Sequence, residues 1–272
     1  MVRPLLAVSL IVGLVGCKSA EKKCAEDKDE AACQTACDAG KTKSCVKLAD
    51  MKLLGKGKKD PSGAYKLYKT ACKADDAYAC ARTAYMMGRP GGPKYNNDKY
   101  IEIAKDACKA DDQLGCALWG HATHFGTEAE KVKAESLARK ACEADIVEGC
   151  VLTAAWSIDK SEKVEKSKKK LEELCDGGNS LGCFYLSLAL IYGSGGVEKD
   201  GEKAEEINKK WCDEDEPLFC SLLSTQYEKG YGVPVSAKKA YASIKKACKL
   251  MDDDGHQYCA LEKKLKPKDA DD

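Results

Sequence analysis

The chain has 272 residues, a formal net charge of +1, seventeen cysteines and three histidines. Its lysines are interleaved with acidic residues, and it has no basic stripe rich in arginine and aromatic residues, so we expect no nucleic-acid partner. So many cysteines are typical of an oxidising compartment, while the lack of a Cys-x-x-Cys motif and the few histidines disfavour zinc. We expect neither a metal nor a cofactor.

Residues 1–16 have the pattern of a signal peptide, because Arg3 precedes an apolar run, 5–15, that is too short to span a membrane. The run ends in Leu14-Val15-Gly16-Cys17, which resembles the lipoprotein box of bacteria, in which the cysteine is lipidated and becomes the mature N-terminus. Lipidation of Cys17 predicts a lipoprotein of the bacterial cell envelope, in the outer membrane facing the periplasm or the surface. The lipid would be its only contact with the membrane. The alternative is an ordinary cleaved signal that leaves Cys17 as a spare thiol.

Residues 17–32 follow as the lipidated N-terminus and a charged tether. The stretch from Lys18 to Glu30 is nearly all charged or small, which predicts a solvated segment without a core of its own.

The remaining sixteen cysteines fall into pairs, and six of these pairs have a step of eight residues. The leading cysteines of these pairs recur at nearly constant intervals, which is typical of a stacked repeat with one crosslink per unit. The regular pairs are Cys37–Cys45, Cys72–Cys80, Cys108–Cys116, Cys142–Cys150, Cys175–Cys183 and Cys212–Cys220. Two further pairs depart from the step: Cys248–Cys259 is longer, and Cys24–Cys33 is weakly specified because Cys33 and Cys37 could exchange partners.

The step of eight residues requires a turn between the two cysteines. Along one helix it would separate the Cα atoms by about 12 Å, whereas a disulfide permits roughly 4.4–6.8 Å. Each disulfide should therefore join the end of one unit's second helix to the start of the next unit's first helix, and Asp76, Asp112, Asn179 and Glu216 are expected caps in these turns.

The last full unit shows the helical hairpin that we expect in each repeat. Leu222, Leu223 and Tyr227 have helical spacing, residues 230–234 break the chain, and Ser236 opens a second amphipathic helix. The equivalent first residues of the second helices are predicted N-caps: Asp60, Asn96, Asp200 and Ser236. Columns of small residues at matching positions of the units should let the helices pack closely. The sequence thus predicts an all-α solenoid of six to seven disulfide-linked hairpins over residues 33–262, followed by a charged tail, 263–272.

The segment Tyr227-Glu228-Lys229-Gly230-Tyr231-Gly232-Val233-Pro234, followed by Lys239-Ala240, resembles the Sel-one-like repeat, a relative of the tetratricopeptide repeat. Gly196-Val197, Asp200 and Lys203-Ala204 repeat the pattern, and it weakens at Gly126-Thr127 and Ile158-Asp159. With one cysteine pair per unit, the match is to the exported, cysteine-rich branch of the family. The resemblance implies a right-handed solenoid whose concave face binds a protein or peptide. Some exported members are labelled penicillin-binding or β-lactamase-like.

Serine β-lactamases resemble one another in Ser-x-x-Lys, Ser-Asp-Asn and Lys-Thr-Gly motifs. The first spacing occurs five times in this lysine-rich chain, as at Ser44 and Lys47, and neither of the other motifs occurs. We therefore assign no catalytic residue. His121 and His124 lie three residues apart but lack a third ligand, so they are better interpreted as groove or surface residues than as a metal site.

The first helices of such hairpins usually line the inner surface of the solenoid. Residues two and five positions after the second cysteine of a pair then give the predicted partner-binding groove: Tyr85, Leu118, His121, Tyr185 and Leu188. The alternative is that these side chains only pack between helices. The sequence favours a lipid-anchored envelope scaffold that binds a protein or peptide partner. The alternatives are a β-lactamase-like or penicillin-binding hydrolase, and an assembly or redox helper for other envelope proteins.

Overall fold

The computed structural model describes residues 18–54, 60–88, 97–251 and 257–267. Over these ranges the chain forms fifteen α-helices and one short 3-10 turn, without a strand. The helices are α1 (Ala20–Asp27), α2 (Glu30–Asp38), α3 (Thr42–Leu54), α4 (Pro61–Cys72), α5 (Ala77–Met87), α6 (Asn97–Lys109), α7 (Gln113–Thr123), α8 (Glu128–Glu143), α9 (Val147–Asp159), α10 (Val164–Asp176), α11 (Ser180–Tyr192), α12 (Gly201–Asp213), α13 (Pro217–Lys229), α14 (Ala237–Lys249) and α15 (Gln257–Leu265), with the 3-10 turn at Ser194–Gly196.

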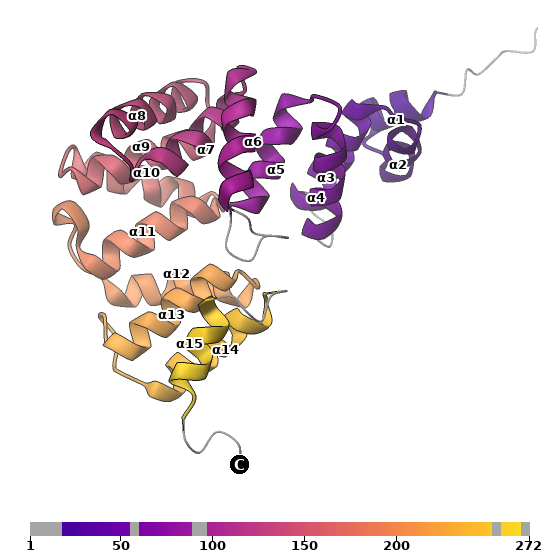
Figure 1. Cartoon of the computed structure of the whole chain (residues 1–272). Helices are drawn as coiled ribbons and strands as arrows, with labels where there is room; N and C mark the ends of the chain where they lie inside the picture. The colour runs from indigo at the N-terminus through magenta and orange to yellow at the C-terminus, as the bar shows by residue number, and fades with distance from the viewer. Residues whose placement is uncertain (1–17, 55–59, 89–96, 252–256, 268–272) are drawn as a thin grey trace, which may run out of the picture.

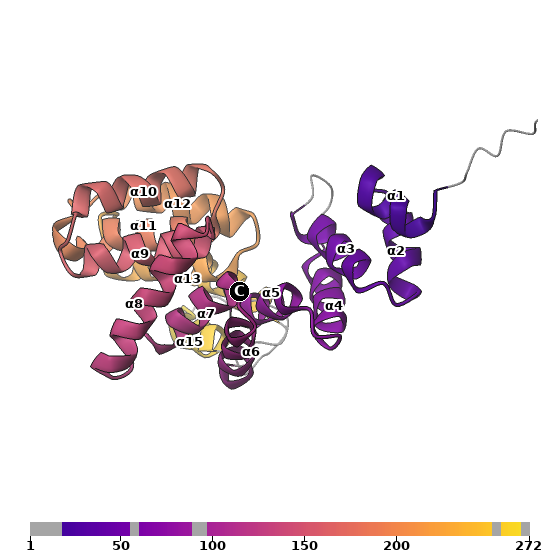
Figure 2. The same ribbon diagram turned by 90° about the horizontal axis from the view of Figure 1, so that it is seen from above.

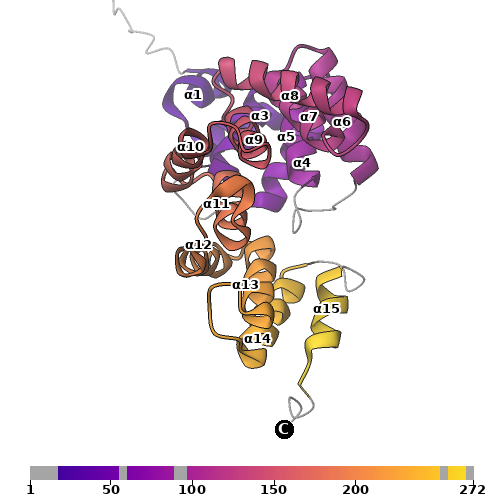
Figure 3. The ribbon, with the colours of Figure 1, turned by 90° about the vertical axis from the view of Figure 1, so that its left-hand side faces the viewer.

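Consecutive helices pack in pairs, so that the chain is a row of hairpins from α1–α2 to α13–α14, ended by α15. The row follows an open arc in Figure 1. Seen from above, α1–α4 lie at one side of the molecule and α9–α13 at the other (Figure 2). At the C-terminal end, α13, α14 and α15 lie side by side (Figure 3). The predicted all-α solenoid of disulfide-linked hairpins is confirmed.

A turn of constant conformation joins each hairpin to the next. The residue three positions after each leading cysteine has a positive φ, which ends the helix because the chain can no longer continue its hydrogen bonds. Aspartate and glycine occupy this position, both of which tolerate the left-handed region. These residues are Gly40, Asp75, Asp111, Asp145, Gly178 and Asp215.

Side-chain caps then start the next helix in three of these turns. Asp76, Asp112 and Asn179 accept hydrogen bonds from backbone N–H groups three residues ahead, as predicted. The prediction for Glu216 is wrong: it occupies the N-cap position of α13 without a side-chain cap hydrogen bond. Its longer side chain does not form the tight ring that aspartate and asparagine form at this position.

The predicted caps of the second helices are also present where the structure describes them. Asp60, Asp200 and Ser236 accept from the backbone N–H groups of Gly63, Lys203 and Lys239. Asn96 lies outside the described residues.

Eight disulfides cross the turns of the solenoid. The structure joins Cys24–Cys33, Cys37–Cys45, Cys72–Cys80, Cys108–Cys116, Cys142–Cys150, Cys175–Cys183, Cys212–Cys220 and Cys248–Cys259. Every pair but the first links the second helix of one hairpin to the helix that follows it. Cys24–Cys33 instead joins the two helices of the first hairpin, and Cys37 remains with Cys45. Because each bridge closes a loop of eight to eleven residues, it restrains only neighbouring helices.

Small residues lie where the helices of a hairpin approach most closely. A Cβ atom on Gly120 of α7 would lie 2.9 Å from the carbonyl oxygen of Ala134 on α8. The equivalent positions of other hairpins are fully buried: Ala49, Ala84, Ser187 and Ser224. Larger side chains there would push the two helices apart, so the predicted columns of small residues fix the spacing within each hairpin.

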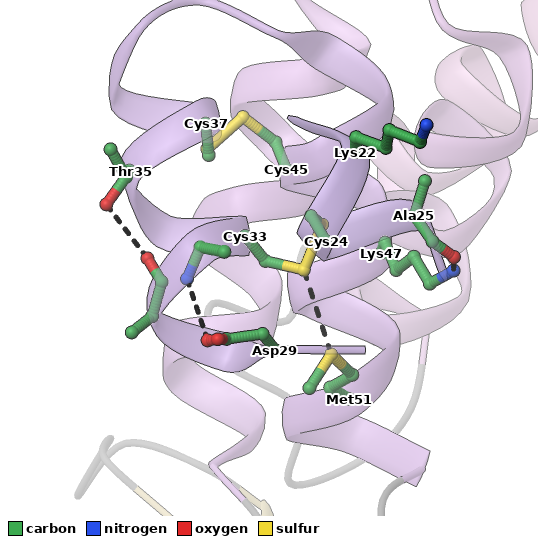
Figure 4. The surroundings of a disulfide bond; sticks show 12 residues. Lys22, Cys24, Ala25, Asp29, Cys33, Thr35, Cys37, Cys45, Lys47 and Met51 are labelled. Atoms are coloured by element: carbon green, nitrogen blue, oxygen red, sulfur yellow. Dashed lines mark hydrogen bonds between the residues drawn. A yellow bond between two sulfur atoms is a disulfide. The ribbon is translucent and has the colours of Figure 1, made fainter. Parts of the chain in front are cut away.

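The charged segment before residue 33 is more ordered than the sequence suggested. Residues 20–27 form α1 and residues 30–32 the first turn of α2, so the expectation of a solvated tether over 17–32 is wrong for this stretch. Figure 4 shows the reason: the Cys24–Cys33 disulfide lies against α3, with the sulfur of Met51 4.0 Å from that of Cys33. Cys24 and Cys33 are buried together with Leu48, while the charged residues cover the outer side.

The C-terminal end of the solenoid can be compared with the expected boundary. The last helix, α15, ends at Leu265, three residues beyond the predicted end of the solenoid. Residues 1–17, with the predicted signal peptide and Cys17, lie outside the described ranges. Within those ranges no helix has the length and apolar character needed to cross a membrane. Eight disulfides are typical of proteins that fold in an oxidising compartment outside the cytoplasm.

Candidate functional site

The concave side of the solenoid contains a cavity of about 410 Å³. The first helices of five successive hairpins, α5, α7, α9, α11 and α13, contribute most of its wall. The lining residues are Tyr85, Gly88, Tyr100, Leu118, His121, Phe125, Glu148, Leu152, Ser180, Leu181, Phe184, Tyr185, Leu188, Glu216, Leu218 and Phe219. Its volume is in the range of sites that bind small molecules or the side chains of a partner.

The five residues predicted for the groove all line this one cavity: Tyr85, Leu118, His121, Tyr185 and Leu188. They come from α5, α7 and α11, whereas Arg82, which occupies an equivalent position of the repeat, does not line the cavity.

Sequence reasoning missed several lining residues that the curvature of the chain brings in. Phe184 precedes a predicted groove position by one residue and lies edge-on against Tyr185, with ring centroids 5.2 Å apart. Phe125 is 80% exposed at the rim and lies in the turn between α7 and α8. Tyr100 belongs to a second helix, α6, where the register predicts packing only. An exposed aromatic residue in a polar turn, such as Phe125, was the one sequence signal that could have been used.

A polar network at one end of the cavity connects three hairpins. Arg82 Nε donates to the Tyr78 hydroxyl at 3.0 Å, and both Tyr78 and Tyr68 donate to Asp50 Oδ1, at 3.1 and 2.5 Å. Burial and the hydrogen bond to Asp50 raise the pKa of the Tyr68 hydroxyl well above its usual range. The guanidinium of Arg82 also lies 3.7 Å from a carboxylate oxygen of Glu148, which belongs to α9, two hairpins further along the chain. This ion pair crosses the concave side and helps to fix its curvature.

His121 lies within the wall of the cavity as a neutral imidazole. Burial, and to a lesser extent the nearby His124, lowers its pKa to about 4. The Tyr100 hydroxyl donates its only proton to the carbonyl oxygen of Leu118 at 2.8 Å. Its oxygen lies 3.3 Å from Nδ1 of His121 and can therefore only accept, so Nδ1 carries the proton. The other ring nitrogen, Nε2, is left as an acceptor and makes no hydrogen bond to a described residue.

The second histidine of the pair faces away from this arrangement. His124 is stacked on the indole of Trp156, with ring centroids 3.9 Å apart, and its Nδ1 has no hydrogen-bond partner. Among the described residues, no three metal-binding side chains come together in a way that would hold an ion. His121 therefore lines the cavity, whereas His124 packs against Trp156.

The serine considered for a hydrolase site lies elsewhere in the fold. Ser44 is buried in the first turn of α3, and Lys47 Nζ donates to the carbonyl oxygen of Ala25 at 2.6 Å. Neither residue lines the cavity.

Comparison of the sequence with models of known protein families identifies the type of repeat. The model of the Sel1 repeat matches residues 42–76, 77–99, 113–146, 180–215 and 218–250, together more than half of the chain. The chain belongs to the Sel1 repeat family. Its first residues, through α2, and the hairpin formed by α9 and α10 fall largely outside the matched ranges, although the structure gives that hairpin the same form.

Two curated relatives of this Sel1 repeat protein match over a limited region. Cytochrome c oxidase assembly factor 7A of Xenopus laevis is 35% identical over 66 residues, which are 24% of this chain and 29% of the relative. Cytochrome c oxidase assembly factor 7 of Xenopus tropicalis is 30% identical over 82 residues, 30% of this chain and 36% of the relative. The chain thus spans about a third of the length of these relatives.

Solved structures similar to this Sel1 repeat protein include two repeat proteins from bacteria. One is a protective antigen of uropathogenic Escherichia coli with an SLR fold, at a TM-score of 0.46 and 18% identity, covering 93% of this chain and 54% of that one. The other is a Sel1 repeat protein from Oxalobacter formigenes, at a TM-score of 0.44 and 20% identity, covering 81% of this chain and 99% of that one.

Proposed function

We propose that this Sel1 repeat protein is a lipid-anchored scaffold of the bacterial cell envelope that holds a segment of a protein or peptide partner in its concave cavity. The observation that carries the proposal is the single cavity to which five successive hairpins contribute, lined by tyrosine, phenylalanine and leucine side chains. Such side chains provide a large contact area at a low cost in conformational entropy, and they are enriched at the centre of protein interfaces.

The disulfides support a groove that is rigid before it binds. Each of the six crosslinks with a step of eight residues restrains the angle between two neighbouring hairpins, so little ordering of the scaffold would accompany association. Lower ordering cost leaves more of the interaction free energy as affinity.

Photo-crosslinking in cells tests the scaffold. A benzophenone side chain at Phe184, within the cavity, should capture a partner band that a benzophenone at Val132 does not. Val132 is a matched control because it is an exposed apolar residue, 67% accessible, on α8 and outside the cavity. Capture of the same proteins from both positions, or from neither, contradicts binding in the cavity.

The lipid anchor has its own test. Cys17→Ala should release the protein from the membrane fraction and abolish incorporation of a labelled fatty acid. A variant that stays in the membrane fraction would contradict lipidation of Cys17.

An assembly role for the same scaffold is a second candidate, motivated by the names of the two relatives, which are assembly factors of cytochrome c oxidase. In this version the bound segment belongs to a subunit that awaits incorporation into a complex. The redox form of that idea has less support, because each of the sixteen cysteines in the described ranges is already in a disulfide. The hydrolase alternative gains no residue from the cavity, where neither Ser44 nor Lys47 lies.

A further inference from the structure

The charged groups in the lining of the cavity are hydrogen-bond acceptors. Among its described lining residues the charged side chains are two carboxylates, Glu148 and Glu216, and no lysine or arginine contributes, although the chain has 45 such residues. Carboxylates are thus the only charged side chains in the described wall of this cavity, in a chain whose net charge is +1. Charge complementarity selects partners of the opposite sign.

Glu148 has acceptor capacity that the protein leaves unused. Its exposure is 9%, so its carboxylate is largely desolvated. The contact with Arg82 is 3.7 Å long, beyond hydrogen-bond distance, and no described residue donates a hydrogen bond to the carboxylate. A carboxylate in such a position is stabilised by a further donor, because its own desolvation is only partly offset by the ion pair.

His121 adds a second acceptor on the same wall. Its Nδ1 proton is committed to the oxygen of Tyr100, which leaves the lone pair of Nε2 without a partner in the described structure. A neutral imidazole in this tautomer accepts a hydrogen bond and does not repel a cation.

Aromatic rings line the same cavity as the two acceptors. They belong to Tyr85, Phe184 and Tyr185. A cation over the face of such a ring is attracted by its quadrupole, more strongly where water is excluded.

We propose that the cavity selects a partner segment that presents an arginine side chain between apolar residues. This inference rests on the proposed function and names the chemistry of the bound segment. A guanidinium offers five N–H donors in a planar fork, so it can serve the carboxylate of Glu148 and Nε2 of His121 together while it stacks on a ring. The compact ammonium of lysine is more strongly hydrated and cannot stack in this way.

The guanidinium of Arg82 does not cancel this selectivity. It lies outside the lining of the cavity and is bound through Nε to Tyr78, which in turn donates to Asp50. The guanidinium approaches two carboxylates, Glu148 directly and Asp50 through Tyr78, so they outnumber it. A second cation would therefore still meet a net negative environment.

The test starts from a random heptapeptide library displayed on phage and selected on the immobilised full-length mature chain. The double variant Tyr85→Ala/Tyr185→Ala, which removes two aromatic walls, serves as the counter-selection. Enriched peptides should carry arginine next to leucine, phenylalanine or tryptophan. Circular dichroism of each variant, compared with the wild type, confirms that the helices are intact.

Synthetic peptides then isolate the guanidinium. In the best enriched peptide, arginine is replaced by citrulline, which has nearly the same shape without the charge, or by lysine. Fluorescence anisotropy should show at least about tenfold weaker binding for citrulline, with lysine in between. Glu148→Gln should reduce the preference for arginine over citrulline to about threefold or less, and His121→Phe should also reduce it. Glu143→Gln, the same change at an exposed residue of α8, should leave the preference unchanged.

The outcomes separate the two proposals. Enriched peptides without arginine, equal affinity for the citrulline peptide, equal affinity for the lysine peptide, or a preference that survives Glu148→Gln would each overturn the arginine site and leave a peptide-binding groove. Failure of the wild type to enrich any sequence over Tyr85→Ala/Tyr185→Ala would overturn both the arginine site and the groove.

Discussion

His121 should make the stability of this protein depend on pH between the pKa of its imidazole in the folded chain and that of an ordinary histidine. Its pKa in the folded state is about 4, against 6.5 for an ordinary histidine, because burial disfavours the imidazolium. Between these two values the unfolded chain binds a proton that the folded chain does not. The contribution of His121 is therefore complete above pH 6.5 and is lost as the pH falls towards 4.

The size of the effect follows from the same two values. One pKa unit is worth about 1.4 kcal/mol, so the free energy of unfolding should fall by about 2.5 kcal/mol between about pH 7.5 and about pH 4.5 through this residue alone. Urea unfolding at both pH values, followed by circular dichroism with the disulfides intact, measures the loss.

The comparison that isolates His121 uses two variants. His121→Leu should lose about 2.5 kcal/mol less than the wild type over this range, whatever its stability at neutral pH. Tyr185→Phe changes the same cavity but keeps the imidazole, so it should retain the wild-type dependence. An equal loss of stability in wild type and His121→Leu would refute the neutral, buried imidazole described above.

Three other substitutions test the framework of the fold. Replacing Cys175 and Cys183 together by alanine should lower the free energy of unfolding by about 2.5 kcal/mol, measured in urea, because an eight-residue loop is no longer closed. Asn208→Ala should lower the free energy of unfolding by about 2–3 kcal/mol in the same assay, since the fully buried amide bridges the buried side chains of Ser187 and Gln226. Thr225→Ala, which removes a half-buried hydroxyl, should lower it by less. Asp112→Ala removes an N-cap and should lower stability by about 1 kcal/mol, measured by thermal unfolding.

The architecture could be predicted because it is encoded within each repeat. Cysteine spacing, a cap residue after the turn and a small residue at the helix contact are all local signals, and each recurs in several units. The repeat register indicated the groove positions Tyr85, His121 and Tyr185, since equivalent residues of a solenoid share a surface, but it did not exclude Arg82, which lies outside the lining.

The features that could not be predicted depend on contacts between units. Nothing in the sequence near Glu148 indicates that Arg82 lies opposite, because the ion pair joins hairpins that are not neighbours and so depends on the curvature of the whole row. The charged composition of residues 18–30 suggested a solvated segment, and the packing of Cys24 and Cys33 on α3 overrides it. The charged residues account for the solvent-facing side of α1 and α2. Cys24 and Cys33 account for the side that packs on α3.

The short reach of every crosslink bears on how the mature protein is made. A newly emerging chain needs only eight to eleven residues beyond a leading cysteine to supply its partner, long before the cysteines of the following unit arrive. Closure of a short loop costs less entropy than closure of a long one, so as the chain enters the oxidising compartment each leading thiol meets its correct partner first. Correct pairing therefore needs little later exchange, except at Cys33 and Cys37, which lie four residues apart and compete for Cys24.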